Sequence, residues 1–329
     1  MAERFDIAVL GPIPFDRITT YQGERIQKFG CAVYTVAALS ALMQDQDRSR
    51  ILPVAHVRKG ELATIRELLA ALPGVEVDHI TADADQGDVI TLRYVDQNQR
   101  IERQTGFMNP ITAEDIADLM AVDAFVCVPI TDFEVPLGTL QAIKAKSDAL
   151  IVFDAHGPTN CCNRHGERAL KFWVERDLWL PYIDILKMNR DEAGCCWFGN
   201  DYDLETLQAI GELPMDQLPK LAAHCLERGV KALYVTLDEH GCAVYFKDPS
   251  GRMREHVVKR VAVDQVVDTT GCGDSFAAGL AFGYLCTQDF VKACWYGNAM
   301  GAQRCTGSEL AVYRNLEDTE RQIADTYVD

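Results

Sequence analysis

Short apolar runs recur along the chain, and stretches with apolar residues three and four positions apart separate them. A short apolar run is typical of a buried strand, whereas the wider spacing is typical of an amphipathic helix. Their regular alternation predicts an α/β fold, a doubly wound and mostly parallel sheet flanked by helices. The predicted strands are Phe5–Leu10, Ile51–Val57, Ala124–Val128, Ala149–Asp154, Ile183–Met188 and Leu233–Leu237.

The intervening stretches are rich in helix-forming residues. The predicted helices are Ala32–Met43, Glu61–Leu72, Glu114–Leu119, Leu137–Lys146, Glu167–Trp179, Asp216–Arg228 and Phe290–Arg304. Gly241–Lys247 and Arg252–Lys259 are predicted to form an antiparallel pair around a turn at residues 248–251. No internal repeat or long linker interrupts this order, so we expect one domain over residues 1–329.

Two segments, at residues 17–28 and 88–105, break the alternation because they are polar and rich in β-forming residues. The second is expected to fold into a hairpin around residues 96–99. We interpret the two segments as a small β-sheet that projects from the main domain, and we call it the lid. The alternative is that both segments are surface loops.

Charge and composition narrow the range of partners. The chain has 329 residues, of which 48% are hydrophobic, and its 32 basic and 49 acidic residues give a net charge of -17. This charge repels nucleic acid and anionic membranes, so we expect neither as a partner. The apolar runs are too short to cross a bilayer and the first six residues lack a signal-peptide layout, which predicts a cytoplasmic protein.

Twelve cysteines occur, but none in a C-x-x-C pair. We therefore expect mostly buried free thiols in a reducing compartment rather than disulfides or zinc ligands. The one alternative is a metal cluster that a loop would gather from His156, Cys161, Cys162 and His165.

The most informative stretch runs from Asp268 to Phe276 and reads D-T-T-G-C-G-D-S-F. Gly271 and Gly273 flank Cys272, which lets the backbone turn tightly and point its N–H groups one way at the start of a helix. Asp274 lies in the first helical turn, where its carboxylate can accept a proton from a bound hydroxyl. An anion site beside such a base suits phosphoryl transfer to an alcohol, although a glycine-rich loop with a capping Asp is the simpler alternative.

This stretch resembles the C-terminal motif D-T-x-G-A-G-D of the PfkB/ribokinase family of ATP-dependent kinases, with Cys272 in place of Ala. The resemblance implies a ribokinase-like fold and transfer of the γ-phosphoryl group of ATP to a hydroxyl of a sugar or sugar-like molecule. It implies that Asp274 is the general base, and that the backbone of Gly271, Cys272 and Gly273 holds the migrating group.

The family resemblance also implies an acceptor site under the lid. Asp16 follows the first strand, where the family has an Asp that binds acceptor hydroxyls, and Gly30 is retained from a Gly-Gly pair. Pro14 stands where ribokinase has an Asn, so the sequence departs from a ribose site. Tyr34 is a candidate to stack on an acceptor, or else a packed core residue.

On the donor side, Asn189 and Glu192 match the N-x-x-E motif of the family, which organises water around Mg²⁺ and the phosphates. Thr236 and Gly241 match a segment that lines the ATP site, and Asn298 matches a position beside the adenine pocket.

Two further features concern charge near the phosphates. Asp238 replaces the usual Gly of the ATP-site segment and brings a negative charge. Asp268 and the turn at residues 305–308 correspond to the monovalent-cation site of many relatives, which implies a possible K⁺.

We therefore expect a carbohydrate kinase that uses ATP and Mg²⁺. The alternatives are a nucleoside kinase of the same fold, and a catalytically silent nucleotide- or sugar-binding regulator. Because small sheets expose edges and an apolar face, here with Val89, Leu92 and Ile101, we also expect a homodimer joined through the lids.

Overall fold

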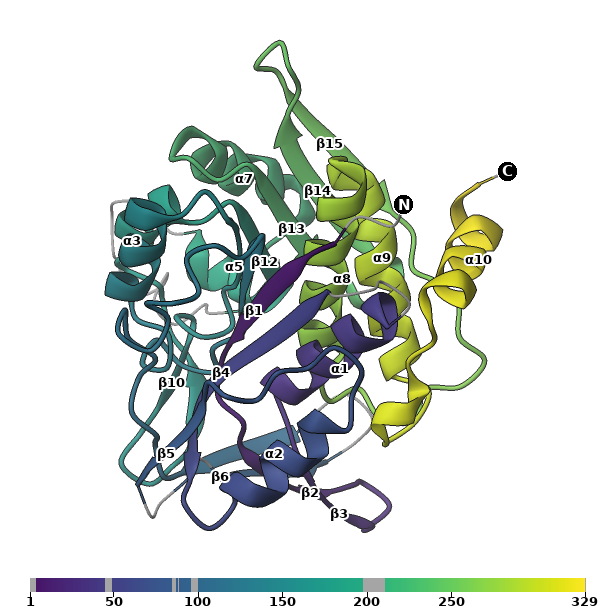
Figure 1. Cartoon of the computed structure of the whole chain (residues 1–329). Coiled ribbons are helices and arrows are strands. Elements are labelled where there is room, and N and C mark those ends of the chain that lie inside the picture. The colour runs from purple at the N-terminus through teal and green to yellow at the C-terminus, as the bar shows by residue number, and fades with distance from the viewer. Residues whose placement is uncertain are drawn as a thin grey trace.

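A large central sheet organises the chain, as expected (Figure 1). The computed structural model describes residues 4–44, 49–84, 87, 89–95, 100–197 and 211–328. The described residues form a nine-stranded sheet in the order β15-β14-β13-β12-β9-β8-β1-β4-β5. All neighbouring pairs from β13 to β5 are parallel, and β14 and β15 add an antiparallel edge. The strands are β1 (Asp6–Leu10), β4 (Arg50–Arg58), β5 (Ile80–Ala84), β8 (Ala124–Cys127), β9 (Leu150–Asp154), β12 (Ile185–Asn189), β13 (Ala232–Thr236), β14 (Cys242–Lys247) and β15 (Met253–Val258).

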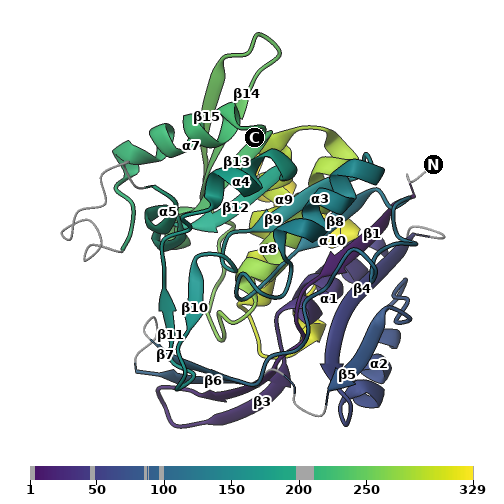
Figure 2. The ribbon, with the colours of Figure 1, turned by 90° about the vertical axis from the view of Figure 1, so that its left-hand side faces the viewer.

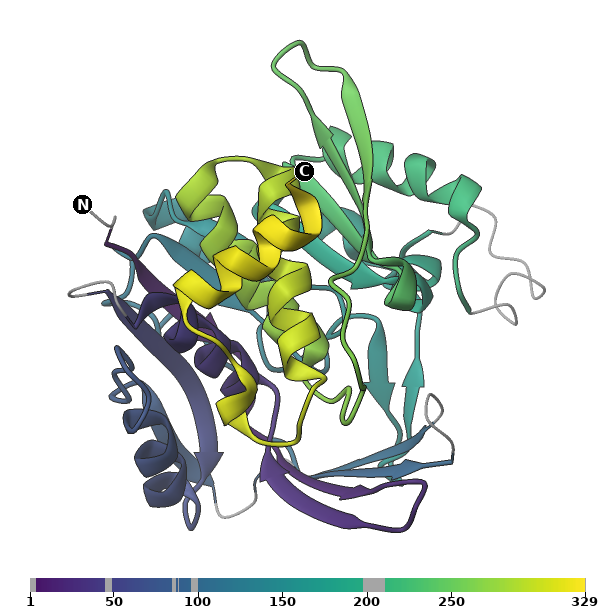
Figure 3. The same cartoon turned by 90° about the vertical axis from the view of Figure 1, so that its right-hand side faces the viewer.

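Helices cover both faces of this sheet (Figures 1 and 3). Alternate residues of β1 belong to opposite hydrophobic cores: Ile7 and Val9 to one, Ala8 and Leu10 to the other. One face is covered by α1 (Ala32–Met43), α2 (Leu62–Ala70), α8 (Cys272–Thr287) and α9 (Phe290–Arg304), with α10 (Leu316–Tyr327) outside α9. The other is covered by α3 (Leu137–Lys146), α4 (Arg176–Trp179), α5 (Arg190–Cys196) and α7 (Leu218–Glu227).

Among the described helices, none combines the length and the apolar character needed to span a bilayer.

Each of the six predicted parallel strands is present within two residues of its predicted ends, and the antiparallel pair is confirmed. Two predicted helices are wrong. Residues 114–119 form turns, and residues 167–179 contain the strand β11 (Arg168–Leu170) before the short α4. β11 pairs with β10 (Asn160–Cys162), and Gly166 in the connecting turn accepts a backbone hydrogen bond from Gln104 of the lid at 2.8 Å. Contact with the lid therefore overrides the local helical pattern.

The lid is a separate four-stranded sheet in the order β3-β2-β6-β7 (Figure 2). Its strands are β2 (Phe15–Thr19), β3 (Arg25–Phe29), β6 (Val89–Tyr94) and β7 (Arg100–Thr105). β6 and β7 pair antiparallel as expected, while the predicted hairpin turn at residues 96–99 lies outside the described residues.

One face of the lid is buried and the other is exposed, so the expectation of a single exposed apolar face is wrong. Ile18, Ile90 and Leu92 are buried against the main domain of the same chain, and Leu92 is only 4% exposed. Ile101 lies on the outer face and is 57% exposed. Because strand residues alternate between faces, Val89, Leu92 and Ile101 do not share one apolar face, and Leu92 is not available to a second copy.

Candidate active site

The amino end of α8 forms a backbone cradle at the carboxyl edge of the parallel strands, where open α/β sheets bind ligands. Gly271 caps the helix with φ at 88°. Within the described chain, the amides of Gly271, Gly273 and Asp274 donate to no carbonyl or side chain. Unpaired amides at the positive end of a 16-residue helix favour an anion.

Close packing explains why both cradle positions are glycine. A Cβ on Gly271 would lie 2.3 Å from the ring of Tyr34, and a Cβ on Gly273 would lie 2.8 Å from Nζ of Lys187. The loop therefore lies directly on an aromatic ring and an ammonium group. Tyr34 is 1% exposed and also faces the cations of Lys28 and Arg304. Its ring is thus packed beneath the cradle, while Tyr34 also belongs to the lining of the cavity, so its contact with an acceptor stays a prediction.

Asp274 lines a cavity of about 240 Å³ together with the glycines of the cradle. Its carboxylate lies 3.8 Å from the thiol of Cys31. Burial, reinforced by the negative charge of Asp154, raises the pKa of Asp274 to about 6, while Lys187 opposes this rise. The group is therefore ionised at neutral pH and remains close enough to its pKa to accept and release a proton.

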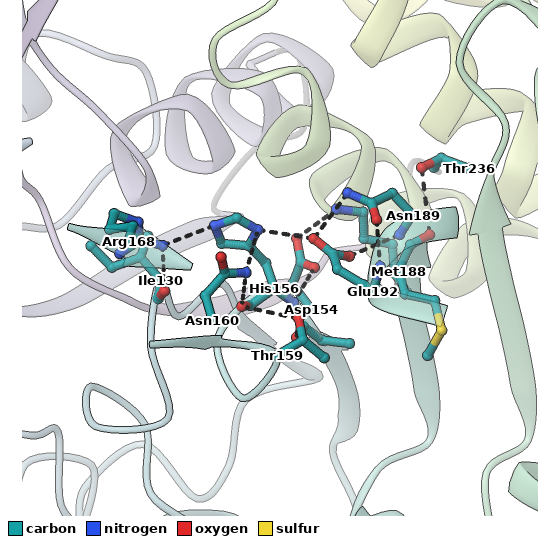
Figure 4. A network of polar contacts seen from close by, with 12 residues as sticks. Ile130, Asp154, His156, Thr159, Asn160, Arg168, Met188, Asn189, Glu192 and Thr236 are labelled. Carbon is teal, nitrogen blue, oxygen red and sulfur yellow. Dashed lines mark hydrogen bonds and ion pairs between the residues drawn. The ribbon is translucent and has the colours of Figure 1, made fainter. Parts of the chain in front are cut away.

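Asp154, His156 and Glu192 belong to a buried network of polar contacts (Figure 4), and the charges of Asp154 and His156 act on Asp274. Lys187, on β12, donates to Asp154 at the end of β9 over 2.6 Å, and both side chains are almost fully buried. Burial would lower the pKa of Lys187, but the facing carboxylates of Asp154 and Glu192 raise it, so the residue stays an ammonium ion. The positive charge of Lys187 offsets the negative charges of the neighbouring carboxylates.

Asn189 and Glu192 form a capping box at the start of α5. Glu192 Oε2 accepts from the amide of Asn189 at 2.8 Å, while Oε1 accepts from the Asn189 side chain at 3.1 Å and from Nδ1 of His156 at 2.9 Å. Asn189 therefore caps α5, and the carboxylate of Glu192 is largely engaged within the protein.

His156 and Arg168 extend this network toward the lid (Figure 4). Arg168 contacts Glu102 at 3.0 Å, Gln104 at 2.6 Å, the carbonyl of Ile130 at 2.7 Å and Nε2 of His156 at 3.3 Å. Since a guanidinium group can only donate, Nε2 of His156 accepts, and Nδ1 carries the proton given to Glu192. Arg168 thus fixes β11 and β7 to the main domain.

Asp16 lines the same cavity from β2, the first strand of the lid. It is 4% exposed, and a Cβ on Gly30 would lie 2.2 Å from its carboxylate oxygen. Gly30 therefore makes room for Asp16 rather than lining the cavity. Ile90 and Leu92 of the lid also line the cavity.

Of the predicted nucleotide-site residues, Asn189 and Glu192 line this cavity, whereas Thr236, Gly241 and Asn298 do not. The hydroxyl of Thr236 donates to the carbonyl of Met188 at 3.4 Å, and Gly241, with φ at 92°, packs against the backbone of residues 258–260. Asn298 donates to the carbonyl of Lys259 and to the hydroxyl of Tyr327, both at 3.0 Å. Asp238 adopts φ of 50°, a conformation that suits glycine.

The remaining predicted residues lie behind the cradle. Asp268 accepts hydrogen bonds from Lys28 and Arg304. The pKa of Cys272 is raised by its contact with Cys305 and by burial, so this thiol is not activated by the helix start. In the described part of the chain, no group of three or more His, Cys, Asp or Glu side chains is arranged to hold a metal ion.

The sequence did not point to Asp154, Lys187 or Arg168 as residues of this site. It pointed to His156 only as a candidate metal ligand, and not as part of this network. A signal was present for two of them, because Asp154 ends an apolar strand and Lys187 is a charged residue within one. A larger hollow of about 760 Å³ lies at the amino ends of β1 and β4, away from this chemistry.

Comparison with known proteins agrees with this geometry. The chain is 36% identical over 100 residues to an uncharacterized sugar kinase of Archaeoglobus fulgidus, covering 30% of this chain and 38% of that protein. It is 35% identical over 132 residues to the 2-dehydro-3-deoxygluconokinase of Bacillus subtilis, covering 39% and 37%. The chain thus spans less than two fifths of the curated relatives it matches.

The fold is similar to that of Arabidopsis thaliana ribokinase solved with ribose and ATP, with a TM-score of 0.71, 17% identity and coverage of 98% of this chain and 99% of that chain. Residues 74–312 match the pfkB family of carbohydrate kinases. Because this match covers most of the chain, the protein belongs to the pfkB carbohydrate kinase family.

Proposed function

We propose that this protein transfers the γ-phosphoryl group of ATP to a hydroxyl of a small neutral sugar or polyol. The observation that carries the proposal is that one cavity is lined by Asp274, by the glycines of the cradle with their unpaired amides, and by Asp16. An acceptor held by Asp16 under the lid would present a hydroxyl between the base and the anion site.

In this mechanism Asp274 accepts the proton of the acceptor hydroxyl while the hydroxyl oxygen attacks the γ-phosphorus. The bond between the γ-phosphorus and the bridging oxygen breaks, and ADP leaves. The amides of Gly271 and Gly273, with the dipole of α8, stabilise the negative charge of the migrating group. Lys187 limits the rise in the pKa of Asp274, which keeps the base ionised.

Mg²⁺ would neutralise charge on the donor phosphates, which together with water would supply most of its ligands. Asn189 and Glu192 fit an outer contact to such an ion, since Glu192 already accepts from His156 and Asn189. We keep Thr236, Gly241 and Asn298 as candidate nucleotide contacts, which a structure with bound nucleotide would test.

The charges of the acceptor end favour a neutral acceptor. Asp16 and Glu102 are acidic, and the guanidinium of Arg168 is already held by four contacts within the chain. A carboxylate or phosphate on the acceptor would face these acids without a dedicated cation.

We propose a cytoplasmic location because all twelve cysteines are free thiols, as expected in a reducing compartment. Detection of the protein in an oxidising compartment with paired cysteines would contradict it.

An acceptor screen tests the function directly. With Mg-ATP, we expect ADP release with neutral sugars or polyols such as fructose, ribose and myo-inositol, and much weaker release with 2-dehydro-3-deoxygluconate, sugar phosphates or nucleosides. A preference for the sugar acid would contradict the neutral acceptor. Absence of turnover with every acceptor would favour the silent regulator.

Replacement of the base provides a second test. Asp274→Asn should lower kcat by about 10²–10⁴ and leave ATP affinity within a few fold, because the carboxylate acts on the acceptor. In the wild type, kcat/KM should be maintained above pH 6 and fall as the pH drops below about 6, where Asp274 becomes protonated. Near-normal turnover by the Asn variant would exclude this role.

The cradle provides a third test. Gly271→Ala should lower kcat by about 10²–10³, because the new Cβ would overlap the Tyr34 ring and displace the anion-binding amides. Gly251→Ala is the matched control: it has a similar φ of 80° but open space around it, so activity should stay near wild type. Equal activity of the two variants would argue against a cradle of fixed geometry.

Finally, we propose a homodimer joined at the outer face or open edge of the lid, where Ile101 and Val95 are 57% and 61% exposed. Sedimentation should give about twice 36.6 kDa. Ile101→Glu should dissociate the dimer, whereas Val257→Glu, equally exposed on β15, should not. A wild-type monomer would refute the dimer and leave the kinase proposal intact.

A further inference from the structure

A fixed guanidinium group lies behind the phosphate cradle. Arg304, at the end of α9, is completely buried and donates through Nη2 to Asp268 at 2.8 Å and through Nη1 to the carbonyl of Gly307. Asp268 immediately precedes the cradle, and its other oxygen accepts from the amide of Thr270 at 2.9 Å. One side chain therefore joins the loop that forms the cradle to the turn that follows α9.

Arg304 also supports the cradle through Tyr34. The guanidinium lies 4.6 Å from the centre of the Tyr34 ring, and the same ring packs against Gly271, where a Cβ would lie 2.3 Å from a ring carbon. Cation, ring and cradle are thus in successive contact. Lys28 of the lid adds a second cation to Asp268.

These contacts do not fit a bound monovalent cation at Asp268. Such an ion needs carboxylate and carbonyl oxygens that converge on an open position. Here Arg304 engages the Asp268 carboxylate and the Gly307 carbonyl, and Lys28 engages the same carboxylate. A cation added beside them would face two like charges in a buried environment. The pKa of Asp268 stays below its usual value despite burial because Lys28 and Arg304 face it.

We propose that Arg304 is a built-in replacement for the monovalent cation, a positioning residue that holds the cradle loop in place so that phosphoryl transfer requires no K⁺. The proposal rests on the kinase function above. It predicts that K⁺ changes neither the activity nor the Tm of the wild-type protein. It also predicts that removing the guanidinium creates a site that K⁺ can occupy.

The first experiment compares the wild-type protein in KCl with the protein in tetramethylammonium chloride at equal ionic strength, after exhaustive dialysis. We expect kcat and the KM for ATP to agree within about twofold, and the Tm to be the same in both salts. Activation by K⁺ of tenfold or more, or a saturable rise in Tm with K⁺, would overturn the proposal. The Tm reports on K⁺ even if no acceptor is phosphorylated, so failure of the kinase function is distinguishable.

The second experiment uses Arg304→Met, which keeps most of the apolar stem and removes the charge. In tetramethylammonium its kcat should fall at least tenfold, and K⁺ should restore part of the activity and raise the Tm in a saturable manner. Arg321→Met is the control, because Arg321 is an exposed arginine on α10 and its loss should create no response to K⁺. A folded Arg304→Met protein with the same kcat and Tm in both salts would overturn the proposal. If this variant does not fold, the wild-type comparison still decides the question.

Discussion

The ion pair between Lys187 and Asp154 is the interaction on which the site depends. Asp154, Glu192 and Asp274 converge at the carboxyl edge of the sheet, where few waters can screen their repulsion. Lys187 lies among them and against Gly273, so one ammonium group balances the carboxylates and supports the start of α8. Removing one partner of such a buried pair typically costs about 3–5 kcal/mol. The carboxylate of Asp274 can therefore be buried and still ionise.

The cradle is held from behind by a second set of cations. Arg304 and Lys28 converge on Asp268, and the ring of Tyr34 fills the space between Arg304 and Gly271. The backbone at Gly271 has no room for a side chain, so the positions of its amides follow from packing against a rigid ring. Preorganised donors of this kind stabilise developing charge without having to reorient during the reaction.

The lid is connected to the chemistry through polar contacts rather than through an apolar face alone. Arg168 links Glu102 and Gln104 of the lid strand β7 to His156, and His156 links to Glu192 at the start of α5. Because both nitrogens of one imidazole take part, the lid strand β7 and the start of α5 are joined by one chain of hydrogen bonds.

The sequence by itself determined the fold class, the small second sheet and the positions of Asp274, Asp16 and the glycine cradle. Buried strands, a glycine-flanked helix start and a capping Asn are local patterns that the chain carries in consecutive residues. Only the tertiary structure decided which distant side chains meet. It turned residues 168–170 into a strand against the lid, buried Tyr34 under Gly271, and brought Arg304 to Asp268 from 36 residues away. The physical reason is that long-range packing and charge pairing depend on how the elements dock, and no local pattern of the sequence records that docking.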